Sequence, residues 1–305
     1  MSRGADHGQV REEKSQRRTA VRELFQIWRN TRMIVLTAIS AAAYVAVLIP
    51  FKGFVIIPGL TEVRPGAAIP IVLSFLFGPA AAWGAGFGNV IADTFGGMLG
   101  PGSLFGFLGN FLYGYLPYAL WRALMGHADP TRSGARGWVT YLLILVVSCL
   151  VIGAVIGWGA DLLRLAPFAA LGLIIAVNNL MASAAISTVL LTLLFARVSN
   201  WGLLYYQIMD DEPIEFQQGF PDLGMQLQPA AAGRAGRRGK TAYVGAVLCM
   251  IGAAAAFLTG LYISGQALQA GYGSAAFASG SAGSFAVGVG MLPGLLLLLI
   301  GAALL

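Results

Sequence analysis

Long apolar runs separated by short polar segments dominate the chain. Eight runs predict helices, near residues 33–50, 66–78, 80–97, 103–123, 138–160, 166–196, 241–263 and 284–305. A helix needs about 20 apolar residues to cross the hydrocarbon core of a bilayer, and most of the runs reach or approach that length. The pattern therefore predicts an all-α polytopic membrane protein.

The apolar stretch from residue 66 to residue 97 predicts two short helices rather than one long helix. Gly78 and Pro79 interrupt it, and this pair of residues commonly separates helices. With the break, both termini face the cytoplasm together with 16 Lys and Arg residues, against 3 outside: Lys52, Arg64 and Arg164. One long helix would move the later loops to the other side and abolish this asymmetry, so the positive-inside rule favours two helices.

The same pattern divides the chain into four sections. Residues 1–32 form a polar, basic arm that is too long for the start of a cleavable signal peptide. Residues 33–198 form a six-helix membrane core. Residues 199–240, which are rich in Pro, Gly and mixed charge, indicate a cytoplasmic linker. Residues 241–305 form a two-helix membrane extension.

Composition agrees with a membrane protein and argues against several other classes. Hydrophobic residues make up 57% of the chain and charged residues only 10%, whereas soluble domains carry about 25% charged residues. The net charge of +6 comes from cations that flank apolar runs, so we expect contact with the lipid bilayer and not with nucleic acid.

The sequence offers no pattern for catalysis, a metal or another cofactor. Cys149 and Cys249 lie in apolar runs, and His7 and His127 lie outside them. The stretch "GRRGKT" at 236–241 has the wrong glycine spacing for a phosphate-binding loop, and no strand precedes it. We therefore expect neither an enzyme nor an ATPase within this chain.

Polar side chains in the outward half of the predicted bundle are the best candidates for a binding site. Asn89 and Asp93, in "GFGNVIAD", lie four residues apart and so share one helix face. Hydrogen bonding between helices is an alternative role for each, but the convergence of the set favours a small-molecule pocket. The full set is Glu62, Arg64, Asn89, Asp93, Asn110, Tyr113, Trp158, Asn178 and Asn179. We expect Arg64 to pair with Asp93, with Lys52 and Arg164 as alternatives.

The first membrane helix carries a flat face of small residues. Ala38, Ala42 and Ala46 recur every four residues, which permits close approach of another helix. Spacing alone favours packing within the same chain over contact with a partner.

Several motifs, in order, resemble those of S components, the substrate-binding subunits of energy-coupling factor (ECF) vitamin transporters. They are "AISAAAYVA" on the first helix, "EVRPGAAIP" at the end of the first outer loop, "LFGPAAAWGAGFGNVIAD" and "GSLFGFLGNFLYGYLPYALWR". The resemblance covers residues 33–197 and leaves out the last two predicted helices.

The resemblance implies a six-helix S-component bundle in the plasma membrane that binds a vitamin or related micronutrient from outside. It also implies partners, namely a membrane coupling subunit that meets the Ala38, Ala42 and Ala46 face, and cytoplasmic ATPases. The extension has no charge to place on a ligand, so we expect it to be dispensable for substrate binding. The alternative is an ion-coupled secondary transporter acting alone, which would need ionisable groups at mid-membrane depth; Asp93 and Asp161 lie nearer the outer ends.

Overall fold

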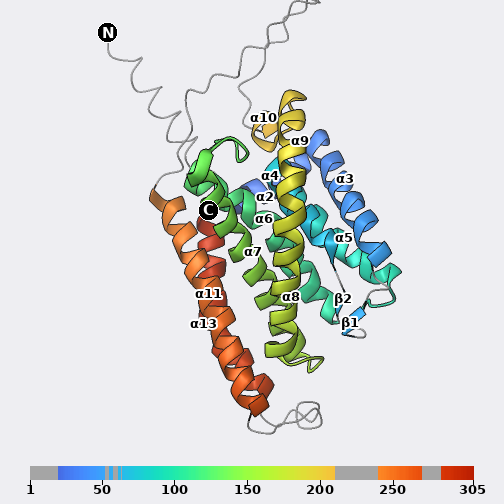
Figure 1. Ribbon diagram of the computed structural model, residues 1–305, viewed down its shortest axis with the longest axis vertical. Coiled ribbons are helices and arrows are strands. Elements are labelled where there is room, and N and C mark those ends of the chain that lie inside the picture. Colours follow the sequence, from blue (N-terminus) through green and yellow to red (C-terminus); the bar gives the residue numbers. More distant parts are fainter. Residues whose placement is uncertain (1–19, 52–54, 58–60, 63, 210–239, 270–282) are drawn as a thin grey trace, which may run out of the picture.

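The computed structural model describes residues 20–51, 55–57, 61–62, 64–209, 240–269 and 283–305. The longer helices run side by side along the long axis of the molecule (Figure 1). They are α3 (Thr31–Leu48), α4 (Ala68–Phe77), α5 (Pro79–Phe95), α6 (Gly102–Met125), α7 (Gly134–Leu162), α8 (Phe168–Ala182), α9 (Thr188–Asn200), α11 (Lys240–Gln269) and α13 (Gly283–Leu304).

The helical membrane architecture predicted from the apolar runs is confirmed. Five of the described helical segments are long and apolar enough to cross a bilayer: Thr31–Phe51, Gly134–Leu162, Phe168–Met209, Lys240–Gln266 and Phe285–Leu304. Large apolar side chains such as Val139, Leu142, Leu193 and Leu296 are exposed on the outside of the bundle. Such a surface is suited to lipid rather than to water.

The predicted break between α4 and α5 is present at Gly78. Its backbone has φ of 52°, in the left-handed region, and Pro79 begins α5. A Cβ atom at this position would lie 3.0 Å from Cγ of Tyr205 and 3.2 Å from Cδ2 of Tyr118. Both the backbone conformation and the aromatic packing therefore require glycine here.

The helix predicted over residues 166–196 is continuous but contains a π-helical turn, η4 (Ser183–Ser187), between α8 and α9. Buried hydroxyl groups hold this turn. Tyr113 Oη lies 2.6 Å from Ser183 Oγ, Tyr141 Oη lies 2.7 Å from Ser187 Oγ, and Ser183 Oγ donates to the carbonyl of Ala67. The turn thereby ties α8 and α9 to α6, α7 and the start of α4.

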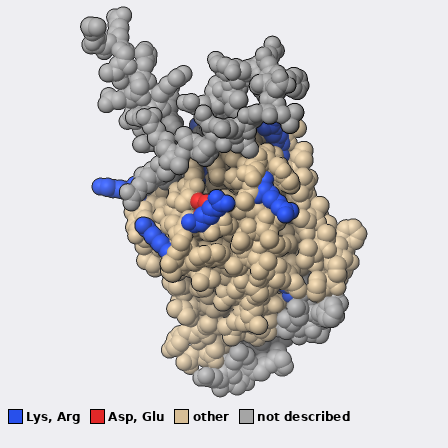
Figure 2. Space-filling model, turned by 45° about the horizontal axis from the view of Figure 1, so that its top comes forward, with Lys and Arg blue, Asp and Glu red and all other residues tan. Residues whose placement is uncertain are grey.

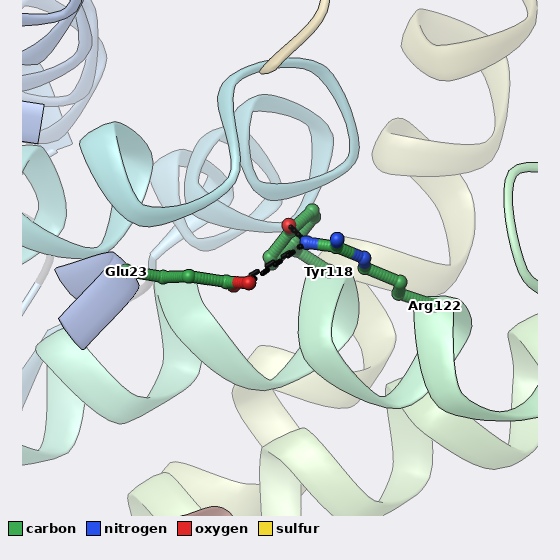
Figure 3. Close-up of polar contacts among 3 residues, drawn as sticks. All are labelled: Glu23, Tyr118 and Arg122. Atoms are coloured by element: carbon green, nitrogen blue, oxygen red, sulfur yellow. Dashed lines mark hydrogen bonds and ion pairs between the residues drawn. The ribbon is translucent and has the colours of Figure 1, made fainter. Parts of the chain in front are cut away.

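The packed bundle extends further in sequence than the predicted core. Helix α2 (Ala20–Gln26) lies within the arm expected to be polar, and α10 (Tyr205–Met209) lies within the expected linker. In α2, Glu23 is 2% exposed and forms an ion pair with Arg122 of α6 at 3.2 Å, and Arg122 also donates to Tyr118 Oη (Figure 3). Hydropathy does not register such buried charge pairs, so both short helices lie outside the section predicted as the membrane core, whose bounds stay a prediction.

The predicted first outer loop contains a short antiparallel pair of strands, β1 (Val55–Ile57) and β2 (Thr61–Glu62). A single 3-10 turn, η3 (Pro65–Ala67), then leads into α4. Figure 1 shows β1 and β2 at the lower end of the bundle, away from the end at which α3 begins.

Glycines of α5 allow it to pack closely on α3. A Cβ atom on Gly84 would lie 2.5 Å from Cβ of Ser40, and one on Gly88 would lie 2.9 Å from Cδ1 of Tyr44. The contact therefore uses the Ser40 and Tyr44 face of α3, opposite to its row of spaced alanines.

The two-helix extension packs as a hairpin against α7 and α8. Helices α11 and α13 lie side by side at the left edge of the bundle in Figure 1. Gly252 and Gly294 lie at their contact, where added Cβ atoms would approach Leu298 N and Ala256 N to 2.4 and 2.5 Å. Small residues thus permit close backbone approach in this hairpin.

Candidate functional site

A cavity of about 230 Å³ lies between the C-terminal ends of α5 and α7 and the N-terminal ends of α6 and α8. Polar groups from α5, α6 and the loop before α4 form one side, and apolar groups from α7, α8 and the turn between them form another. The lining residues are Arg64, Asn89, Asp93, Met98, Gly100, Pro101, Gly102, Ser103, Gly106, Ile156, Ala160, Leu165, Leu171 and Ile175. This combination is typical of sites for small molecules.

Asp93 accepts hydrogen bonds from two other residues on the polar side of the cavity. Its side chain is 7% exposed, and its Oδ2 accepts hydrogen bonds from Asn89 Nδ2 at 3.1 Å and from Ser103 Oγ at 3.0 Å. Asn89 lies one turn earlier on the same face of α5, as the four-residue spacing predicted. Ser103 comes from the first turn of α6, so the carboxylate joins the two helices.

The hydrogen bonds continue inward from Asn89 to α3. Asn89 Oδ1 accepts from Asn110 Nδ2 at 3.0 Å, and Asn110 Oδ1 accepts from the hydroxyl of Tyr44 at 2.8 Å. Because Asp93 Oδ2 accepts from Asn89 Nδ2, the Asn89 Oδ1 atom points to Asn110 and accepts from it, and Asn110 Oδ1 in turn can only accept from Tyr44. The chain of bonds therefore has a single direction, from α3 to the cavity.

Glycine at position 106 lets Asn89 reach Asp93. An added Cβ atom there would lie 2.6 Å from Asn89 Nδ2, and the Gly106 carbonyl accepts a second bond from Asn110 Nδ2 at 2.8 Å. A side chain at this position would displace the amide from the carboxylate.

Arg64 faces the same cavity as Asp93. It lies at the start of η3, after β2, and is 7% exposed. The side chains of Arg64 and Asp93, which come from different elements, thus line the same cavity. The ion pair that we expect between them stays a prediction.

The other predicted site residues are distributed more widely. Tyr113 is completely buried and binds the π-helical turn, and Asn178 lies partly buried on α8. Trp158 donates its indole N–H to the carbonyl of Gly288 in α13 at 3.1 Å and does not line the cavity. For Glu62 the backbone lies in β2, and its side chain is outside the described part of the structure.

Asn179 differs from the other predicted site residues in the environment of its amide nitrogen. It is 1% exposed, and within the described residues its Nδ2 has no hydrogen-bond partner. It lies one helical turn after Ile175, which lines the cavity. A buried amide with a free donor at this depth is a candidate ligand group.

The predicted small-residue face of α3 is exposed. Ala38, Ala42 and Ala46 all lie on the outside of the bundle, whereas Leu36, Ser40 and Tyr44 face inward. Packing within this chain, which spacing alone favoured, is therefore not what these three alanines do in the described structure.

Sequence reasoning missed several cavity residues. Ser103 binds Asp93, and Ile156, Leu171 and Ile175 form the apolar wall. Tyr44, which does not line the cavity, completes the hydrogen-bonded chain behind it and was also missed. A tyrosine hydroxyl within an apolar run was a usable signal for Tyr44. The sequence contains no signal for the aliphatic residues, because aliphatic residues also occupy the lipid-facing positions of membrane helices. Within the described residues no group of three or more His, Cys, Asp or Glu side chains could hold a metal ion.

Comparison with known proteins finds a transporter family. A family model described as QueT transporter matches residues 34–196, more than half of the chain, and this match contains the cavity and the exposed alanines but not α11 and α13. No curated protein and no solved structure matches the chain.

Proposed function

Because the chain belongs to the QueT transporter family, a family of S components of ECF transporters, we propose that it captures a queuosine precursor outside the cell for import. The chain supplies the substrate site, and import is driven by ATP hydrolysis in partner ATPases through a membrane coupling subunit. The substrate belongs to the wider class of vitamin-like micronutrients.

The observation that carries this proposal is the cavity, with its Asp93 carboxylate and Arg64 guanidinium inside the family match. Queuosine contains a 7-deazaguanine base, which is planar and has hydrogen-bond donors and acceptors along its edge. Asp93 supplies an acceptor, and Arg64 supplies donors. The aliphatic side chains of Ile156, Leu171 and Ile175 offer an apolar surface for the faces of the ring.

The charge distribution supports an orientation with both termini in the cytoplasm. Figure 2 shows Lys and Arg side chains on the end of the molecule that comes forward in that view, which is the upper end in Figure 1. The cavity lies toward the other end, near β1 and β2. The positive-inside rule then directs the cavity outward.

The exposed alanine face supports contact with a coupling subunit. Ala38, Ala42 and Ala46 form a flat surface on α3, and a helix of another protein can approach such a surface closely within a membrane. Tyr44, on the inward face of the same helix, is hydrogen-bonded toward the cavity, so the proposed partner surface and the substrate site share one helix.

Equilibrium binding to the isolated chain tests this function. The purified full chain in lipid nanodiscs is mixed with a radiolabelled queuosine precursor, with guanine as a competitor. We expect saturable binding of one molecule per chain without ATP or partner subunits, and weaker binding in Asp93→Asn. Absence of saturable binding of the queuosine precursor would overturn the proposed substrate.

A further inference from the structure

We infer that the C-terminal hairpin of α11 and α13 is a positioning element of the substrate site. It caps the N-terminus of α8 and holds the end of α7, and so fixes the cavity wall that these two helices form. The effect on substrate affinity rests on the proposed function, whereas the effect on α8 does not.

The segment that forms the apolar wall of the cavity also contacts the hairpin. Residues of the α7–α8 segment line the cavity, and residues interleaved with them contact the hairpin. Those that line the cavity are Ile156, Ala160, Leu165, Leu171 and Ile175. Those that contact the hairpin are Trp158, Leu162, Phe168 and Ala169.

The first contact is a helix cap supplied by another helix. The first N–H groups of any helix lack partners within it, and Pro167, before α8, provides no side-chain acceptor. Asp161 Oδ2 accepts from Phe168 N–H at 2.7 Å, and Ser264 Oγ of α11 accepts from Ala169 N–H at 3.0 Å. Ser264 is 3% exposed, so water does not compete for this bond.

The second contact holds the end of α7. Trp158 donates its indole N–H to the Gly288 carbonyl of α13 at 3.1 Å. A Cβ atom on Gly288 would lie 2.6 Å from Cδ2 of Leu162, so α13 approaches α7 closely at this level. Both donors, the indole and the Ala169 amide, would be left without a partner if lipid replaced the hairpin.

The third contact is the packing of α11 around the side chain of Phe168, which is completely buried. Its ring packs edge-on against Phe257 of α11 at 5.6 Å, and an added Cβ atom on Gly260 would lie 2.6 Å from its Cε1. Lipid could cover an apolar side chain equally well, because lipid tails are as apolar as the hairpin. The specific contribution of the hairpin is therefore geometry and hydrogen bonding, not burial.

These contacts revise the expectation that residues 241–305 are dispensable for binding. That expectation rested on the absence of charge, but the hairpin acts through a hydroxyl, a backbone carbonyl and glycines. Its influence reaches the cavity through Leu165, Leu171 and Ile175 without touching a ligand.

The test compares Ser264→Ala with matched variants in the full chain, in nanodiscs. Tyr262→Phe removes a hydroxyl from an exposed side chain of the same helix, and Ser264→Thr keeps the capping hydroxyl. Amide hydrogen exchange is measured over residues 165–176, and the dissociation constant is measured for a radiolabelled queuosine precursor. For Ser264→Ala we expect faster exchange in this segment and an affinity lower by about fivefold, as loss of a helix cap implies. Tyr262→Phe should match the wild type, and Ser264→Thr should restore both quantities.

Unchanged exchange in Ser264→Ala would overturn the inference, because the cap would then not hold α8. Faster exchange with unchanged affinity would also overturn it, because the hairpin would then not position the site. If the wild type binds no queuosine precursor, the proposed function fails on its own, while hydrogen exchange still decides whether the cap holds α8.

Discussion

At the residue scale, a single carboxylate sets the direction of a buried chain of hydrogen bonds. Asp93 accepts from Asn89, Asn89 from Asn110, and Asn110 from Tyr44. Each buried amide in this chain uses its acceptor and its donor, so removing one member leaves its neighbour unsatisfied.

Tyr44→Phe should therefore destabilise the protein by about 1 kcal/mol, because it leaves Asn110 Oδ1 without its donor. The double variant Tyr44→Phe with Asn110→Leu should lose less than the sum of the two single losses. Thermal unfolding in detergent measures this, with Tyr262→Phe as the control. Strictly additive losses would show that the two side chains act independently.

The charge on Asp93 can be tested separately from its hydrogen bonds. In Asp93→Asn the new Oδ1 can still accept from Asn89 and Ser103, so the change removes mainly the charge. We expect Asp93→Asn and Arg64→Gln each to weaken substrate binding, and the double variant to recover part of the loss, since removing one partner of a buried pair costs more than removing both. Equilibrium binding measures the dissociation constants. If the losses of binding free energy in the two single variants simply add in the double variant, the pair is ruled out.

At this scale the sequence predicted the polar members of the site better than the apolar ones. The four-residue spacing of Asn89 and Asp93 was sufficient to place them on one face. Trp158 was predicted to bind substrate because a polar N–H in a membrane needs a partner; its N–H donates to the carbonyl of Gly288, and a role in binding stays a prediction. The sequence has no local signal for such a partner, 130 residues away.

At the element scale, α3 uses two different faces. Its inward face packs against the glycines of α5, and its outward face exposes Ala38, Ala42 and Ala46. The alanine spacing predicted a close-packing face on this helix. It did not show that α5 would pack on the other face, because the small residues at that contact are the glycines of α5.

Ala38→Leu with Ala42→Leu should weaken assembly with the coupling subunit and leave substrate affinity unchanged. The added side chains would point outward and prevent close approach of another helix. Co-purification with the coupling subunit measures assembly, and Ala255→Leu, on the exposed face of α11, is the matched control. Undiminished co-purification of the double variant would assign the partner surface elsewhere.

The inward contact predicts the opposite behaviour. Gly84→Ala should lower the thermal midpoint of the isolated chain, because its Cβ would lie 2.5 Å from Ser40 Cβ and force α5 away from α3. Gly100→Ala is the control, since no atom lies within 4 Å of the Cβ it would add. Equal midpoints for both variants would mean that α3 and α5 tolerate separation.

At the scale of the whole molecule, the helical class and the positions of the main helices followed from hydropathy and charge asymmetry. What hydropathy could not supply was the packing of α2, which depends on the pair of Glu23 with Arg122 (Figure 3), or of α10, where Tyr205 packs edge-on against Tyr118. Both contacts form only in the folded bundle. Hydropathy also gave no sign that α11 and α13 contact the α7–α8 segment, because those contacts involve no charge.

Uptake into proteoliposomes tests most directly whether this chain is the substrate-binding part of an ATP-driven importer. The full chain is reconstituted alone, and in parallel with its coupling subunit and ATPases, and entry of a radiolabelled queuosine precursor is measured. We predict uptake only with the partners and with ATP on the side of the ATPases, and none from proton or sodium gradients across liposomes that hold the chain alone. Gradient-driven accumulation by the chain alone would contradict the proposed function and establish a secondary transporter.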